Sequence, residues 1–229
     1  MPLIGSIGVS SPGFLWKGGG GGTFTDLTFI DSSLVNTTTV TIPSSSKEGD
    51  FAILFDGNLG TETFVTPSGW TSIVTDHYAG GGRAGVAISY KKLTLSDPGS
   101  TVTGISTVGA TNVDKILLVF RPDAGSISTI TPTSINSDIT GVAPASQTIT
   151  TSTGSSPLIL FANYYADSGI APRGLTGGQT SPTEISNGTN PGHYVKYTVL
   201  SGSDFSNRTA SMSDSGNRNS LQSFYIQFT

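Results

Sequence analysis

The chain has no cysteine, few charged residues and only two histidines, and each scarcity removes a class of function. Without cysteine there is no disulfide framework, no thiolate nucleophile and no cysteine-based zinc site. Charged residues make up 11% of the 229 and the net charge is −4, so no surface is expected to attract a nucleic-acid backbone or an anionic membrane. Two histidines are also too few for a three-histidine zinc centre.

Long apolar runs are missing as well. No stretch approaches the ~20 apolar residues of a membrane helix, so membrane insertion is not expected. The first residues, Met-Pro-Leu-Ile-Gly-Ser-Ile-Gly-Val, lack the basic start and continuous apolar segment of a secretory signal. With the absence of cysteine, this predicts synthesis in a reducing cytoplasm without secretion.

The motifs of common enzyme sites are absent or out of context. There is no Gly-x-Ser-x-Gly elbow, and the Gly-x-Gly-x-x-Gly pattern at 80–85 precedes an apolar run typical of a strand, where a phosphate site needs a helix. His77, next to Asp76, is interpreted as a solvated residue at a strand end. We therefore predict no catalytic residue, no cofactor and no metal. Calcium held by loop carbonyls, Asp56 and Asn58 stays an alternative.

Threonine, serine and 30 glycines dominate what is present. Short apolar runs alternate with turn signals such as Asp56-Gly57-Asn58, and no apolar stripe at helical spacing occurs. The pattern predicts an all-β chain, folded as an antiparallel β-sandwich or jelly roll. The strands expected are 24–30, 37–43, 50–56, 70–76, 84–93, 100–107, 114–121, 128–135, 145–151, 157–164, 174–176, 193–200, 207–212 and 222–228.

The chain also repeats itself loosely at an offset near 107 residues. The apolar run at 51–55 returns at 158–161, and Pro-Ser-Gly-Trp-Thr at 67–71 returns as Pro-Arg-Gly-Leu-Thr at 172–176. An ordered series of such matches predicts one strand-rich unit used twice. The domains expected are an arm with a glycine linker at 1–22, a first repeat at 23–124 and a second at 125–229, packed closely together or merged into one sandwich.

Two strands are predicted to be apolar on both faces, at 51–55 and 116–120. An antiparallel sheet with one solvated face shows cleaner alternation, so these strands are expected to be central, with the second face covered. The cover is the other repeat, a loop or a neighbouring subunit. Self-association of the chain as a homo-oligomer is expected.

The first 22 residues are interpreted as an arm. A glycine run at 18–22 predicts a flexible coil, yet the preceding residues are too apolar for a solvated tail. Either the arm packs on its own domain, or it docks on another protein chain. The residues expected to make that contact are Leu3, Ile4, Ile7, Phe14, Leu15 and Trp16.

Several aromatic residues lie near predicted strand ends. Exposed rings of this kind stack on sugars or join subunit interfaces, where tyrosine is enriched. Trp70, which follows a Pro-Ser-Gly turn, is interpreted as a core residue, with a sugar-stacking platform as the alternative. The candidates for glycan contact are Tyr78, Tyr164, Tyr165 and Tyr194.

Four pieces of the first half resemble a domain of bacteriophage structural proteins. They are Lys47-Glu-Gly-Asp50, Thr66-Pro-Ser-Gly-Trp-Thr71, Tyr90 on a strand, and Phe120-Arg-Pro122. The resemblance covers about 37–122, is weaker over 140–229, and carries over no catalytic residue. It implies a non-enzymatic virion protein made in the host cytoplasm, most simply a capsid decoration or head-fibre subunit that binds other virion proteins. A tail or tail-fibre component, or a module that binds host glycans, is the alternative.

Overall fold

The computed structural model is all-β, and it describes a defined part of the chain. The described residues are 26–59, 64–77, 84–103, 111–138, 146–151, 157–166, 175–176, 183–187, 192–200, 208–211 and 219–229. Within these segments there is no helix, and so none that is long and apolar enough to cross a membrane. The predicted arm at 1–22 lies outside the described residues.

Every strand expected from the sequence overlaps a strand of the structure. The described strands are β1 (Leu27–Val35), β2 (Val40–Thr41), β3 (Phe51–Leu59), β4 (Thr71–His77), β5 (Ala84–Lys92), β6 (Thr101–Val102), β7 (Thr111–Pro122), β8 (Ile130–Asp138), β9 (Ser146–Ile149), β10 (Leu158–Ala166), β11 (Leu175–Thr176), β12 (Thr183–Asn187), β13 (Gly192–Leu200), β14 (Arg208–Ser211) and β15 (Asn219–Phe228).

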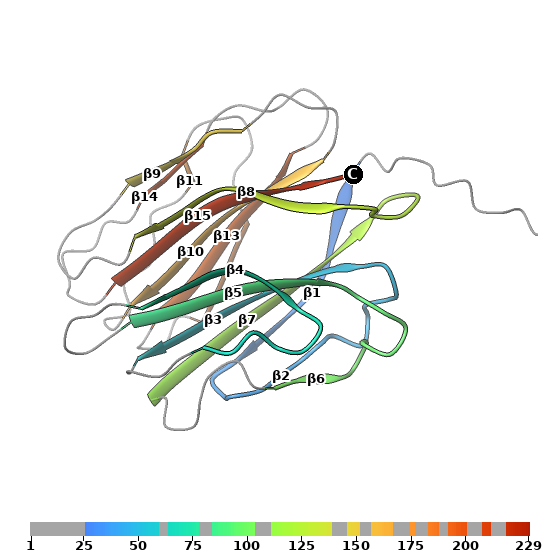
Figure 1. The fold of residues 1–229 in the computed structure, drawn as a ribbon, viewed down its shortest axis with the longest axis horizontal. Helices are drawn as coiled ribbons and strands as arrows, with labels where there is room; N and C mark the ends of the chain where they lie inside the picture. The colour runs from blue at the N-terminus through green and yellow to red at the C-terminus, as the bar shows by residue number, and fades with distance from the viewer. Residues whose placement is uncertain are drawn as a thin grey trace, which may run out of the picture.

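Two five-stranded antiparallel sheets form the body of the fold. The first sheet has the order β1-β7-β3-β5-β4 and the second has the order β8-β15-β10-β13-β12. Each half of the chain supplies one sheet, and the sheets lie face to face as two layers (Figure 1). The two orders correspond strand by strand, as a duplicated unit would require. Duplication and the jelly-roll connection stay predictions.

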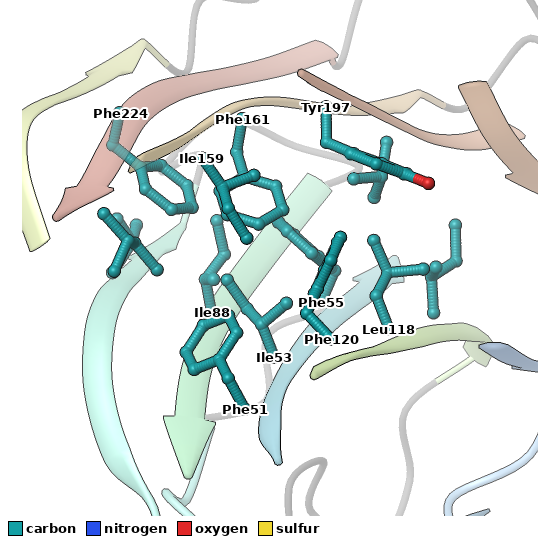
Figure 2. Packing of buried hydrophobic residues seen from close by; sticks show 14 of the residues in the cluster. Phe51, Ile53, Phe55, Ile88, Leu118, Phe120, Ile159, Phe161, Tyr197 and Phe224 are labelled. Carbon is teal, nitrogen blue, oxygen red and sulfur yellow. The ribbon is translucent and has the colours of Figure 1, made fainter. Parts of the chain in front are cut away.

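One apolar core is shared between the two sheets. Side chains alternate along a strand, so Phe51, Ile53 and Phe55 of β3 point to the same face, toward Ile159 and Phe161 of β10. Figure 2 shows these side chains interleaved between the layers. The rings of Phe55 and Phe161 are 5.6 Å apart at their centroids. The two halves therefore form one sandwich with a common interior.

The outer face of each large sheet is covered within the chain by a smaller sheet. The β2–β6 pair lies against the first sheet, where Ala52 and Leu54 pack with Val40 and Val102. The three-stranded sheet β11-β14-β9 lies over the second, where Ile149 packs on that sheet's outer face. Figure 1 shows these small sheets below and above the two large layers. β3 and β7 are interior strands, as predicted, and their second face is covered from within the chain.

Two details differ from the sequence-based expectation. Asp56-Gly57-Asn58, predicted as a turn, lies inside β3, paired with β5 on one side and β7 on the other. β12 was not expected, because Thr183–Asn187 contains a single apolar residue, Ile185. The structure makes this segment an edge strand, and Ile185 is half-buried against the core. In both cases tertiary pairing outweighs local composition.

Candidate functional site

A chain of buried polar side chains crosses the interior near the ends of β10, β13 and β15. His193, Asn163 and Gln222 all point between the sheets, because they share a face with core residues of their strands. All three are fully buried. Ser137 on β8 and Asp76 on β4 continue the chain to the side of the sandwich. We call these five residues the inter-sheet polar network.

The hydrogen bonds of this network all run in one direction. His193 Nε2 lies 2.6 Å from Asn163 Oδ1, and Asn163 Nδ2 donates to Gln222 Oε1 at 2.8 Å. Gln222 Nε2 then donates to Ser137 Oγ at 3.3 Å, and Ser137 Oγ donates to Asp76 Oδ2 at 2.7 Å. Since the Asn163 oxygen is an acceptor, His193 carries its proton on Nε2. Bonds aligned in this way polarise one another, and they end on a carboxylate.

His193 is held neutral by its surroundings. Its ring is fully buried, and burial lowers its pKa to about 3, with the Lys115 charge acting in the same direction and the Asp114 backbone in the opposite one. Among the described residues, none hydrogen bonds to Nδ1. At neutral pH the ring is therefore an uncharged donor to Asn163 and a structural member of the core. Its complete burial also keeps it out of reach of a substrate.

Asp114 of β7 faces the same interior from the first sheet. It lies opposite Gly57, and its side chain is almost completely buried. Burial raises its pKa to about 7; the Asp56 charge adds to this and the Lys115 charge opposes it. Asp114 is therefore half protonated near neutral pH, while His193 stays neutral down to acid pH.

The close approach of the sheets here depends on Gly57. A Cβ at that position would lie 2.4 Å from Cδ2 of Tyr165, a distance that packed atoms do not tolerate. Tyr165 is fully buried with its ring on the Gly57 backbone, and it packs edge-on against His193 with centroids 5.3 Å apart. A glycine within β3 thus makes room for the aromatic ring of the opposing sheet.

The sequence pieces at 47–50, 66–71 and 120–122 have structural roles. Arg121 clamps Asp50 through two bonds, Nε to Oδ1 at 2.9 Å and Nη2 to Oδ2 at 2.8 Å, and Asp50 Oδ2 also accepts from the Lys47 backbone. Gly69 has φ of +77°, and Trp70 N donates to Pro67 O, closing a turn that places the Trp70 side chain in the covered outer face of the first sheet. The interpretation of Trp70 as a core residue is confirmed.

Two shallow hollows lie beside these pieces. One, of about 180 Å³, is lined by Trp70, Lys91 and Asp97, and Lys91 and Asp97 form an ion pair at 2.6 Å. The other, of about 230 Å³, lies over Asp50 and Arg121. Both are smaller than the clefts that enclose most small-molecule ligands.

The predicted glycan contacts are not brought together as an exposed surface. Tyr165 is fully buried and Tyr194 is 6% exposed, so the expectation that these rings face solvent is wrong for both. Tyr165 lies in β10 and Tyr194 in β13, and both strands are interior strands of a sheet that is covered on its two faces. Tyr78 and the side chains of Tyr164 and His77 lie outside the described residues. So do the six arm residues Leu3, Ile4, Ile7, Phe14, Leu15 and Trp16.

Sequence reasoning did not single out the polar network. Aromatic residues near strand ends were expected to be exposed, whereas His193, near the start of β13, is fully buried. The repeat aligns Phe161 with Phe55, so Asn163 corresponds to Gly57: Asn163 lies opposite Val195 and Gln222 as Gly57 lies opposite Val86 and Asp114. Each half therefore places a polar side chain, Asp114 or Gln222, at the same position of the sandwich interior.

Asp56 and Asn58, the alternative calcium ligands, are also buried in β3, and Asp56 is paired with Lys115 at 2.8 Å. Across the part of the chain that the structure describes, no group of three or more acidic or histidine side chains is arranged to hold a metal ion. Comparison with known proteins finds no family model, no curated protein and no solved structure that matches this chain.

Proposed function

We propose that this chain is a non-enzymatic structural subunit of a bacteriophage particle, most simply a capsid decoration or head-fibre subunit. The observation that carries the proposal is the structural role of the sequence pieces for which we propose a resemblance to phage structural proteins. These pieces are used to build the sandwich: the Asp50–Arg121 clamp, the Gly69 turn and the buried Trp70. Sequence pieces that only stabilise the fold support a structural module that functions by binding other proteins.

We propose that the N-terminal arm provides the attachment surface. Both faces of the two large sheets are covered within the chain, so they leave no broad apolar face for assembly. Among described residues, the large apolar side chains that are exposed are scattered: Leu34, Val65, Leu95 and Ile135. The arm brings several apolar residues together in a short stretch, including Phe14, Leu15 and Trp16. Contact through the arm also accommodates self-association, which stays a prediction.

The test uses particles that lack this protein. The full chain is expected to bind them, and a chain without residues 1–22 is expected not to bind. A second variant keeps the length and the glycine run but carries Phe14→Ser, Leu15→Ser and Trp16→Ser, so that loss of binding is assigned to the apolar side chains. Full binding by both variants would overturn the attachment role. Failure of the intact chain to bind any part of the particle would overturn the virion assignment itself.

A further inference from the structure

A fully buried ion pair joins two neighbouring interior strands of the first sheet, β3 and β7. Lys115 of β7 lies directly opposite Asp56 of β3 in the strand register, so the two side chains share one face. Lys115 Nζ is 2.8 Å from Asp56 Oδ1, and both side chains have no exposed surface. The next pair on that face is Leu54 with Leu117, both fully buried and apolar.

Burial makes this pair unusual in its chemistry. An ion pair removed from water loses the hydration of both charges, and the attraction between the charges does not in general recover it. Burial lowers the pKa of Lys115, although the neighbouring Asp56 and Asp114 charges oppose the shift. Transfer of one proton from Nζ to the Asp56 carboxyl group turns the pair into a neutral amine beside a neutral acid. A neutral amine is a nucleophile, whereas an ammonium group is not.

We propose that Lys115 and Asp56 condense into an amide that cross-links β7 to β3. After the proton transfer, the lone pair of Nζ attacks Asp56 Cγ and forms the C–N bond. Nζ then gives a second proton to the hydroxyl oxygen on Cγ, the C–O bond breaks, and one water leaves. The charged ammonium and carboxylate become a neutral amide and water, and no oxidant, reductant or cofactor is needed.

The geometry already holds the reacting atoms together. Because Oδ1 is bonded to Cγ, Nζ lies within about 4 Å of Cγ, close to the range from which such attacks proceed. The strand pairing fixes both backbones, which raises the effective concentration of the amine at the carboxyl group. The pair has no exposed surface, and this burial also limits hydrolysis of the bond.

Asn58 supplies a second observation at the same place. It lies two residues after Asp56 on the same face of β3, and it is fully buried. Within the described segments, neither its Nδ2 nor its Oδ1 has a hydrogen-bond partner, an expensive arrangement for a buried amide. A new amide at Asp56 would add a carbonyl oxygen and an N–H on that face, two residues from Asn58 along the strand, and these are groups that an amide side chain can bond.

The inference does not depend on the proposed function, and its test is a mass measurement on the full-length chain. The denatured protein is expected to be lighter than its sequence mass by one water molecule, and peptide mapping is expected to find Lys115 joined to Asp56. Lys115→Arg is expected to restore the full sequence mass. A matched control is present in the same molecule: Lys196 and Glu184 form an ion pair at 3.0 Å that is partly exposed, and its peptides are expected to remain separate.

Each other result overturns the proposal. An unmodified mass in folded, aged wild-type protein would do so without any variant having to fold. Loss of one ammonia, with Lys115 joined to Asn58, would contradict the assignment of Asp56. A lost water mapped to any other pair of residues would contradict the site.

Discussion

The two interior groups with opposed pKa shifts, Asp114 and His193, make a sharp prediction about how stability depends on pH. Asp114 titrates near 7 when folded, against 3.8 for a free carboxyl group, so the folded state holds its proton more tightly than the unfolded state does. The stability that this provides is complete below pH 4 and is lost as the pH rises through 7. At about 1.4 kcal/mol per pKa unit, the loss is about 4 kcal/mol.

His193 acts in the opposite sense. Its pKa falls from 6.5 to about 3 on folding, so the unfolded state takes up a proton first as the pH is lowered. Its contribution is complete above pH 6.5 and is lost as the pH falls toward 3, by about 5 kcal/mol. Between about pH 4 and 6.5 the two slopes oppose each other and nearly cancel. Titration of these two groups is therefore expected to leave the unfolding free energy of the wild-type protein almost unchanged over this pH range.

Single variants separate the two contributions. The unfolding free energy of Asp114→Asn minus that of the wild type should rise by about 4 kcal/mol as the pH is raised from about 4 to 7, because the buried charge no longer forms in the variant. His193→Gln keeps an N–H donor for Asn163 and removes the titrating ring. The unfolding free energy of this variant minus that of the wild type should fall by about 5 kcal/mol as the pH is raised from about 3 to 6.5. Urea unfolding across this range measures both differences, and the other carboxylates cancel in the comparison. If either difference is independent of pH, the burial argument for that residue is refuted.

Two further predictions concern packing and the clamp. Gly57→Ala should destabilise the fold by about 1–3 kcal/mol, because the new Cβ would overlap the Tyr165 ring. In a Tyr165→Leu background the same substitution should cost clearly less. Equal losses of stability in the two backgrounds, measured by thermal unfolding, would rule out the contact as the cause. Arg121→Lys should lower the unfolding free energy in urea by about 1–3 kcal/mol, because a lysine cannot form the two-bond clamp on Asp50. Lys47→Arg should be near neutral, because Lys47 bonds to Asp50 through its backbone N–H, which the substitution leaves in place. Similar losses in the two variants would contradict the clamp.

Much of the architecture could be predicted because it depends on local pattern. Alternating apolar residues, β-branched residues and glycine turns specify strands, and the doubly apolar runs at 51–55 and 116–120 indicated central strands. The Gly69 turn and the core role of Trp70 followed from short-range backbone chemistry. These properties require only neighbouring residues, so the sequence contains them directly.

The interior chemistry was decided only by the packing of one sheet on the other. Asp56-Gly57-Asn58 reads locally as a turn, yet pairing with β5 and β7 makes it a strand, and the ring of Tyr165 makes its glycine necessary. His193 and Asp114 reach their positions from strands about eighty residues apart, and their pKa shifts arise from the burial that this contact creates. Local composition therefore determined that strands form, while desolvation between two distant segments determined which polar residues are buried, neutral and reactive.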